Sequence, residues 1–420
     1  MPNRCTIYVM SKDLTALHVA TDIVRQLQQA GYVAYFAGGC VRDQIMQLEP
    51  KDFDVATSAR PAQILQLFPH GQKVGAAFGV ILVHRRGWPI EVATFRSDGR
   101  YEDGRHPVDI TFADAQRDAH RRDFTCNGLF WDPIASVLHD YVGGQADIQN
   151  KILRAIGDAA ARFAEDHLRV LRAVRFAARL DFDIEPATWH AMQRAAADIS
   201  GVSRERIGEE LRHIMRHPTR GRAGQLLFES GLLSHIFPIA TANHSGERPG
   251  CLGTLPAHIS FGAGLAALVL EYCPAAPAAR QTADALRTAL ALSSHETADV
   301  GWLLENLVVL EKWRDLPLAR FKRLLAHRLS DDLLVLYSTR APKQQAEILR
   351  QRIAELRADG VAPEPFVTGE DLIHLGATPG PQFKQWLYDL YDLQLENRLP
   401  DRAAALKAAR QMLGAKAAGG

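Results

Sequence analysis

The stretch FAGGCVRDQIMQLEPKDFDVAT, residues 36–57, decides the fold of this chain. An apolar run at 32–37 predicts a short strand, a helical pattern follows the pair Gly38-Gly39 at 41–48, and a second strand is predicted at 53–56. A glycine pair between a strand and a helix lets backbone N–H groups face an anion at the helix N-terminus. This order of elements predicts a mixed α/β domain with a phosphate-binding turn.

Three charged side chains in the same stretch point to chemistry. Arg42 can add a charge-assisted contact to a phosphate at the turn. Asp52 and Asp54 are two residues apart, so in an extended segment both carboxylates point the same way and can hold a divalent metal. Two Mg²⁺ ions held in this way can activate an attacking hydroxyl and clamp a triphosphate. A glycine turn or an Asp pair alone is usually structural, and only their joint order favours a catalytic site.

The pattern changes along the chain from mixed to helical. A helix is predicted at 13–30, strands at 79–84 and 90–95, and a polar loop at 97–108. From residue 159 onwards strand-like alternation disappears, which predicts an all-helical remainder. Within this remainder, core helices are expected at 303–310 and 324–336.

Proline-rich links and this change of pattern divide the chain into four predicted domains. They span residues 1–150, 151–222, 223–360 and 361–420, and only the first has a mixed α/β pattern.

Composition excludes several classes of protein. The 420 residues include 49 Lys and Arg against 48 Asp and Glu, a net charge of +1, so any contact with nucleic acid must be local rather than due to bulk charge. The five cysteines never form a CxxC pair, which argues against a zinc knuckle or a disulfide framework. With no apolar run of membrane-span length and no signal-peptide pattern, the chain is expected to be cytoplasmic and not membrane-bound.

Residues 36–57 resemble the signature of the class II tRNA nucleotidyltransferase and poly(A) polymerase family, within the polymerase-β-like superfamily. Six further blocks resemble the family in its order: EVATFR at 91–96, DGRHP at 103–107, RRDFTCN at 121–127, GGQAD at 143–147, EDHLRVLRAVRFA at 165–177 and RERIGEEL at 204–211. The resemblance implies an α+β fold class, with a polymerase-β-like nucleotidyltransferase head followed by all-helical neck, body and tail domains.

The resemblance also implies roles for individual residues. Asp52 and Asp54 match the metal-binding aspartates, and Gly38, Gly39 and Arg42 match the block that contacts the phosphates of the incoming nucleotide. Substrates are then ATP and CTP, and the cofactor is Mg²⁺.

Two positions, Arg122 and Asp123, belong to a later block. Arg122 matches a nucleotide-binding arginine, and Asp123 a carboxylate that helps in catalysis or in selecting ribose. Glu91 is a second candidate for the third acidic group, because on a strand it shares a face with Ala93 and Phe95. The choice between Glu91 and Asp123 stays open here, as does a purely structural ion pair of Asp123 with Arg121 or Arg122.

A basic helix is predicted at 165–179. At about 100° per residue, the acidic and basic residues fall on one half of it, which without the family would indicate a solvated face. In the family, the matching Asp166 and Arg169 select the nucleotide base, with Arg172 and Arg175 closer to the phosphates or supporting that selection. In the loop at 97–108, Asp103, Arg105 and His106 match a flexible element whose presence implies the capacity to add A.

The sequence of the tail helps to distinguish two activities of the family. Segments such as VTGEDL at 367–372 resemble the part of tRNA nucleotidyltransferases that grips tRNA, and a strongly basic extension typical of poly(A) polymerases is missing. The expected function is addition of CCA, or of its terminal A, to the 3′ end of tRNA by two-metal phosphoryl transfer. The alternative is a poly(A) polymerase that tails RNA 3′ ends with ATP. No obligate protein partner is inferred.

Overall fold

The computed structural model describes residues 15–74, 79–98, 110–237, 250–273 and 278–417. The chain divides into two compact units. The first comprises Met1–Ile214 and Arg222–Ile236, and the second Met215–Gly221 and Phe237–Gly420. The four-domain division remains a prediction, because a division into two units by contacts does not test its boundaries.

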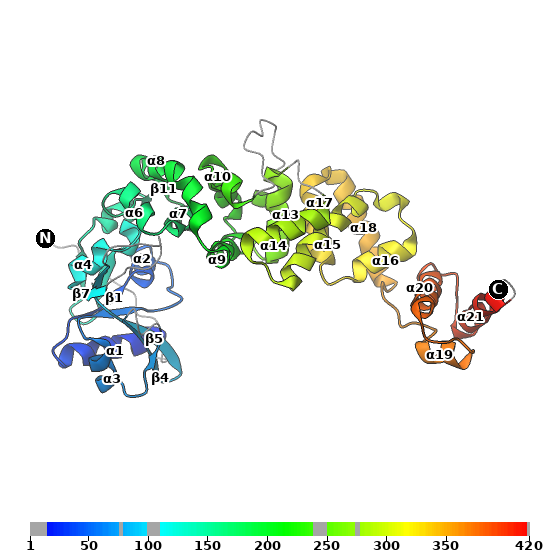
Figure 1. Cartoon of the computed structure of the whole chain (residues 1–420), viewed down its shortest axis with the longest axis horizontal. Coiled ribbons are helices and arrows are strands. Elements are labelled where there is room, and N and C mark those ends of the chain that lie inside the picture. Colours follow the sequence, from blue (N-terminus) through cyan, green and yellow to red (C-terminus); the bar gives the residue numbers. More distant parts are fainter. Residues whose placement is uncertain (1–14, 75–78, 99–109, 238–249, 274–277, 418–420) are drawn as a thin grey trace. The chain divides into compact units, whose positions relative to one another are not determined.

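A seven-stranded mixed sheet is the framework of the first unit (Figure 1). The strands lie in the order β3-β4-β5-β2-β1-β8-β9, and β2 pairs with β5 in parallel while the other neighbours are antiparallel. Their bounds are β1 Ala34–Ala37, β2 Val55–Thr57, β3 Gln72–Lys73, β4 Val80–Arg85, β5 Trp88–Thr94, β8 Leu129–Asp132 and β9 Val137–Asp140. The predicted strands at 32–37, 53–56, 79–84 and 90–95 are thus present, with slightly shifted ends.

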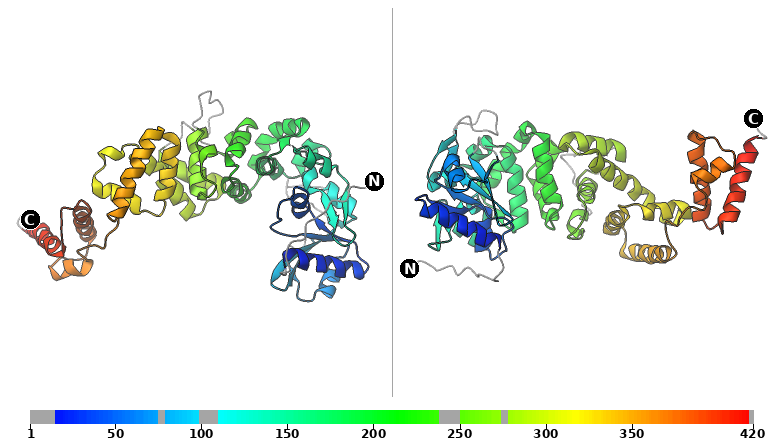
Figure 2. Two further views of the ribbon diagram at one scale, coloured as in Figure 1. Left: turned by 180° about the vertical axis from the view of Figure 1, so that it is seen from behind. Right: turned by 90° about the horizontal axis from the view of Figure 1, so that it is seen from below.

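Helices α1 (Ala16–Gln29) and α3 (Pro61–Leu67) pack on one face of this sheet (Figures 1 and 2). In α1, the residues Val19, Ile23 and Leu27 recur at intervals of four and are fully buried, so the amphipathic pattern predicted at 13–30 is confirmed. The opposite face of the sheet buries Phe95 and Phe130 against α4 (Ala115–His120).

The glycine turn of the opening stretch lies between β1 and α2 (Gly39–Ile45). Gly38 has a φ of 71°, a conformation that side chains other than glycine rarely adopt, and a Cβ there would lie 2.9 Å from Nη1 of Arg122. Helix α2 begins at Gly39, two residues before the predicted start, so the glycine pair forms the helix N-terminus itself.

Further elements, most of them helices, complete the first unit. They are β6 Arg96–Asp98, β7 Ile110–Phe112, η2 Thr125–Asn127, α5 Gly144–Gln149, β10 Ile152–Leu153, α6 Ala159–Glu165, α7 Leu168–Leu180, β11 Asp183–Ile184, α8 Pro186–Ala195, η3 Ala196–Gly201, α9 Arg204–Met215, α10 Arg220–Glu229 and α11 Leu232–Ile236. The two-residue strands β10 and β11 pair in parallel. The remainder after residue 159 is therefore mostly helical, as predicted, with β11 as a small exception.

The described part of the second unit consists of helices. They are α12 Cys251–Thr254, α13 Phe261–Tyr272, α14 Ala279–Leu290, α15 Ser294–Leu310, η4 Trp313–Asp315, α16 Leu318–Ala326, α17 Ser330–Arg340, α18 Lys343–Ala358, α19 Gly369–His374, α20 Pro381–Leu395 and α21 Arg402–Ala417. Helices α13 and α14 both pack against α15 (Figure 1). The core helix expected at 303–310 is the second half of α15.

The single helix predicted at 324–336 is wrong, because the chain breaks between α16 and α17. His327 is extended, with φ −71° and ψ 142°, and its ring stacks on Trp302 at 3.8 Å between centroids. Its Nδ1 accepts a hydrogen bond from the backbone N–H of Leu329. This tertiary contact overrides the helical pattern of the local sequence.

Among the described residues, no helix is both long enough and apolar enough to span a bilayer.

Gly143 and Gly144, at the start of α5, allow a test of how closely this turn packs against its neighbours. A Cβ added to Gly144 would overlap the backbone carbonyl oxygen of Thr125, whereas a Cβ on Gly143, whose φ is 79°, meets nothing within 4 Å. We expect Gly144→Ala to lower stability by about 2–3 kcal/mol through overpacking, and Gly143→Ala by about 1–2 kcal/mol through backbone strain alone. Thermal unfolding of the two variants checks this order, and equal losses would contradict it.

Candidate functional site

Arg42 lies beneath the glycine turn and is almost completely buried, at 3% exposure. Its Nε and Nη2 donate to Oδ1 of Asp43 at 2.8 and 2.6 Å, and its Nη1 donates to Oδ1 of Asn127 at 2.6 Å. The side chain is therefore already paired, and it places positive charge near the turn.

Asp52 and Asp54 precede β2 rather than lying within it. The carbonyl of Asp54 accepts the backbone N–H of Ala37 at 3.0 Å, which ties this segment to the end of β1. Because Val55 pairs with Val92 in the parallel β2–β5 ladder, Glu91 comes next to Asp54. The sheet therefore places Glu91 beside Asp54, and Asp52 precedes Asp54 by two residues.

The electrostatics of this acidic group fit a cation. Desolvation, together with the charges of Glu91 and Asp52, raises the pKa of Asp54 to about 6 against the opposing charge of Arg122. Crowded carboxylates of this kind are hard oxygen donors that a divalent cation neutralises.

No cluster of three or more His, Cys, Asp or Glu side chains in the described part of the chain has the arrangement of a complete metal cage. Mg²⁺ needs no such cage, because it is commonly held by one or two carboxylates together with substrate phosphates. Asp52 and Asp54 fit this mode of binding.

Asp166 lies between two helices, not on one. α6 ends at Glu165, Asp166 is extended with φ −145° and ψ 102°, and α7 starts at Leu168. The continuous helix predicted at 165–179 is wrong at this end, because the carboxylate of Asp166 accepts the backbone N–H of Leu168 at 3.1 Å and replaces a helical bond. The same carboxylate receives Arg206 of α9 at 2.8 Å.

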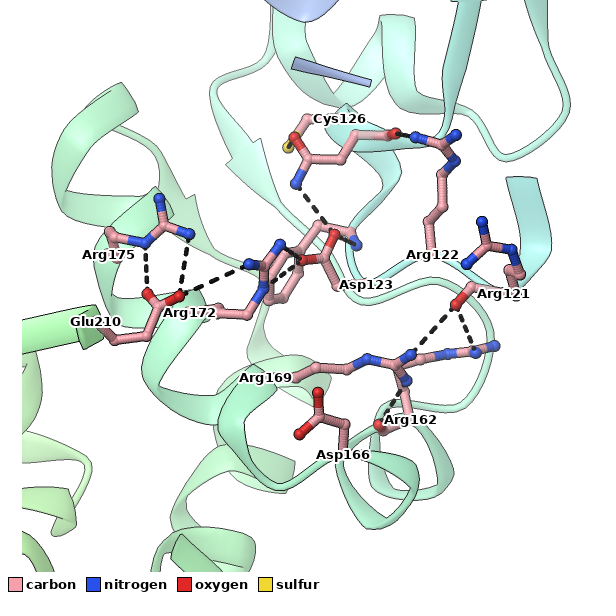
Figure 3. Close-up of polar contacts among 12 residues, drawn as sticks. Arg121, Arg122, Asp123, Cys126, Arg162, Asp166, Arg169, Arg172, Arg175 and Glu210 are labelled. Carbon is pink, nitrogen blue, oxygen red and sulfur yellow. Dashed lines mark hydrogen bonds and ion pairs between the residues drawn. The ribbon is translucent and has the colours of Figure 1, made fainter. Parts of the chain in front are cut away.

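Arg169 projects from the first turn of α7 and is only 8% exposed. Its Nη1 donates to the carboxylate of Glu165 at 2.5 Å and to the carbonyl of Arg162 at 2.9 Å. Its Nη2 donates to the carbonyl of Arg121 at 3.3 Å (Figure 3). The guanidinium is thus held in one orientation, and the interpretation of this helix as a simple solvated face does not hold for Arg169.

Asp123 forms an ion pair with Arg172 of α7 (Figure 3). Nε and Nη2 of Arg172 donate to Oδ2 of Asp123 at 2.9 and 2.6 Å. Oδ1 of Asp123 accepts a hydrogen bond from Nδ2 of Asn127 at 3.1 Å. Burial by itself raises the pKa of Asp123, but Arg172 and these hydrogen bonds outweigh it and bring the pKa to about 2.

The structural alternative considered for Asp123, an ion pair with Arg121 or Arg122, is not what the geometry shows. Arg121 and Arg122 instead pair with Asp118 of α4 at 2.8 and 2.9 Å. Asp118 is buried, and its pKa is lowered because the two arginines outweigh its desolvation.

Arg175 lies one turn after Arg172 on α7. Its Nε donates to Oε2 of Glu210 of α9 at 2.5 Å. Its guanidinium lies over the ring of Phe176 at 4.4 Å. Glu210 also receives Arg172 at 3.7 Å, so one carboxylate holds two arginines of α7 (Figure 3).

A cavity of about 490 Å³ joins these parts. Its lining comprises Gly38, Gly39, Arg42, Asp54, Arg121, Arg122, Asp123, Asn127, Asp166, Leu168, Arg169, Arg172, Phe176, Arg179 and Arg206. Asp52, Glu91 and Arg175 were predicted site residues but are not in this lining. Asp103, Arg105 and His106 lie outside the described residues.

Asn127, Phe176 and Arg206 line the cavity without having been assigned a role from the sequence. All three stand in the blocks that resemble the family, at 121–127, 165–177 and 204–211. Their position in those blocks was the available signal, whereas their residue types alone do not indicate a site.

The mixed sheet, its glycine turn and a cavity with acidic and basic walls define a nucleotidyltransferase-type head joined to helices. Residues 34–154 match the poly A polymerase head domain, and residues 181–243 match the probable RNA and SrmB-binding site of polymerase A. A CCA-adding enzyme of Limosilactobacillus fermentum is 32% identical, with 94% of this chain and 96% of the relative covered. The chain therefore belongs to the class II tRNA nucleotidyltransferase family of CCA-adding enzymes.

Other relatives match over part of their length. A CCA-adding enzyme of Geobacillus sp. (strain WCH70) is 41% identical, and the match covers 52% of this chain and 54% of the relative, about half of its length.

Solved structures match over more of the chain. The Bacillus stearothermophilus CCA-adding enzyme in complex with CTP has a TM-score of 0.73 and 27% identity, covering 96% of this chain and 100% of that one. The Thermotoga maritima CCA-adding enzyme complexed with tRNA has a TM-score of 0.67, covers 94% and 95%, and at 18% identity shows likeness of fold alone.

The ion pair of Asp123 gives a pH-dependent prediction. Because the pKa of Asp123 is depressed in the folded chain, its stabilisation is complete above the unfolded pKa near 4 and is lost as pH falls toward about 2. The contribution is about 2 kcal/mol at neutral pH. We expect the difference in unfolding free energy between wild type and Asp123→Asn to narrow as pH falls from about 6 to about 3. Denaturation series at several pH values measure it, and a difference that does not change with pH would refute the role of this charge.

Proposed function

We propose that this chain adds nucleotides from CTP and ATP to the 3′ end of tRNA, completing CCA or adding its terminal A. The observation that carries the proposal is the single cavity whose lining includes the Gly38-Gly39 turn and Asp54 together with Asp166 and Arg169. One part of this lining suits a triphosphate and the other suits a base. The relatives named above support the choice of substrates, since they are CCA-adding enzymes and one was solved with CTP.

The base end would read nucleotides by hydrogen bonding. A carboxylate such as that of Asp166 accepts from the exocyclic amine that cytosine and adenine both carry, and the Arg169 guanidinium donates to a ring nitrogen or carbonyl oxygen. Arg206 occupies only part of the acceptor capacity of Asp166, because a carboxylate offers about four lone-pair sites. Both side chains line the cavity with their orientation already fixed by other residues.

At the phosphate end, we assign Asp52 and Asp54 to Mg²⁺ and Glu91 to the third acidic position. When bound, two Mg²⁺ ions supply the positive charge for in-line attack of the RNA 3′ hydroxyl on the α-phosphate, with pyrophosphate leaving. The support for Glu91 is its place beside Asp54 in the sheet and its effect on the pKa of Asp54. Gly38, Gly39 and Arg122 would face the phosphates.

We assign Asp123 the role of positioning Arg172. Both of its carboxylate oxygens already accept hydrogen bonds from protein groups, which argues against a place among the metal ligands. Arg172 lines the cavity, so it can contact the nucleotide, whereas Arg175 is tied to Glu210 and would support α7.

The tail at 361–420 we propose to contact the tRNA. Its helices α19, α20 and α21 share an apolar core that includes Leu372, Leu390 and Ala409. We place the enzyme in the cytoplasm, which suits the four described cysteines, Cys40, Cys126, Cys251 and Cys273, because all are free and buried.

One assay separates the proposed activity from the poly(A) polymerase alternative. The protein is incubated with tRNA transcripts that end before CCA, after C and after CC, with CTP and ATP supplied separately and together. Extension that stops at CCA supports the proposal, and extension of the CC transcript alone assigns A addition. Long A tails on any RNA end would overturn it in favour of poly(A) polymerase.

Asp52→Ala tests the metal assignment. We expect loss of at least about a thousandfold in incorporation rate, since the charge clamp on the reacting phosphate is the main catalytic contribution, while tRNA binding changes little. Rates come from single-turnover incorporation and binding from filter retention. Asp22→Ala, which removes a partly exposed carboxylate of α1 that pairs with Arg25, is the matched control and should retain full activity. Robust incorporation by Asp52→Ala would remove the assignment.

A further inference from the structure

The Arg169 guanidinium is held by three acceptors. They are the Glu165 carboxylate, the Arg162 carbonyl and the Arg121 carbonyl, at 2.5, 2.9 and 3.3 Å. None of these groups lies on α7 itself, because Glu165 ends α6 and Arg121 follows α4. The orientation of Arg169 therefore depends on how well these neighbouring segments are held.

The side chain of Arg162 holds two of these acceptors. Its Nη1 donates to Glu165 at 2.8 Å. The same Nη1 donates to the carbonyl of Arg121 at 3.4 Å, and the carbonyl of Arg162 is the third acceptor of Arg169 (Figure 3). Its Nη2 donates to the carbonyl of His120 at 2.8 Å, and its Nε to the carbonyl of Ile156 at 3.2 Å. One partly buried arginine thus joins the end of α4, the turn before α6 and the acceptors of Arg169.

Arg162 lies outside the lining of the cavity that holds Asp166 and Arg169. It lines a separate cavity of about 560 Å³, together with Arg117, His120 and Glu165. Arg121 is in the lining of both cavities. From this position Arg162 can influence a nucleotide through Arg169 and Arg121 rather than by direct contact.

We propose that Arg162 is a positioning residue that sets the discrimination between CTP and ATP by fixing the orientation of Arg169. The proposal rests on the function proposed above. Cytosine and adenine both offer an amine, and they differ in where their acceptor atoms lie relative to it. A guanidinium distinguishes them only when its N–H groups have fixed directions, so loosening Arg169 costs selectivity more than it costs phosphate binding.

The experiment measures kcat/KM for CTP and for ATP separately, on the tRNA end that the full-length wild-type chain extends. Arg162→Ala is expected to lower the ratio for the correct over the incorrect nucleotide about tenfold, the equivalent of one hydrogen bond to a charged group. The kcat for the correct nucleotide should stay within about threefold, because the metal end of the site is untouched. An unchanged ratio would overturn the proposal.

A double-mutant cycle shows whether the effect passes through Arg169. The pair Arg162→Ala with Arg169→Ala should discriminate no worse than Arg169→Ala alone. Losses that multiply would show that Arg162 acts by another route and would also overturn the proposal. If Arg162→Ala unfolds below the assay temperature, Arg162→Lys takes its place in the cycle, since lysine keeps the charge but cannot bridge one carboxylate and three carbonyls.

Arg222→Ala is the matched control. Arg222 belongs to the same unit, donates to the carbonyl of Phe182 at 2.8 Å and pairs with Asp183 at 3.0 Å, without contacting Arg169. The ratio of kcat/KM for the correct over the incorrect nucleotide in Arg222→Ala should equal that of wild type. A wild-type chain that extends no tRNA end would overturn the proposed function as well, whereas an active chain with an unaltered ratio in Arg162→Ala overturns this inference alone.

Discussion

The ion pair between Asp123 and Arg172 is the interaction on which the site depends. Asp123 lies between α4 and η2, and Arg172 lies in the middle of α7, so their contact ties α7 to the segment that links α4 and η2. Through Asn127 the pair connects to Arg42 under the glycine turn, and through Glu210 to Arg175. A charge that is buried without a partner is strongly unfavourable, so the elements that carry these groups constrain one another.

This arrangement explains a feature of the composition. Residues 151–222 carry 14 Lys and Arg against 10 Asp and Glu, yet the arginines of α7 are not a freely solvated surface. Glu165, Asp123 and Glu210 accept Arg169, Arg172 and Arg175 respectively. Acidic partners hold the cations in place around the cavity, and this balance is consistent with a near-zero total charge in a chain whose proposed substrates are anionic.

Much of the fold could be predicted from the sequence, because it depends on local patterns. The spacing of Val19, Ile23 and Leu27 indicates the face of α1, and the Gly38-Gly39 pair indicates a turn whose φ at Gly38 other residues rarely adopt. The break at His327 could not be predicted, since it follows from stacking on Trp302, which is distant in sequence.

The candidate site shows the same limit. The blocks singled out most residues that line the cavity, but not their partners. Whether Asp123 meets Arg172 or Arg122 is decided by how α7 lies against the segment between α4 and η2. The extended conformation of Asp166 is accompanied by a contact with Arg206, forty residues later. Long-range geometry of this kind is absent from periodicity and spacing.

The most direct test of the account is the coupling between Asp123 and Arg172 in nucleotide binding. Calorimetric titration of CTP and ATP into wild type, Asp123→Asn, Arg172→Gln and the double variant measures it. If the pair holds the two sides of the cavity together, the double variant binds about as weakly as the weaker single variant. Losses of binding free energy that simply add would contradict a shared role. They would show that Asp123 and Arg172 contribute independently to nucleotide binding.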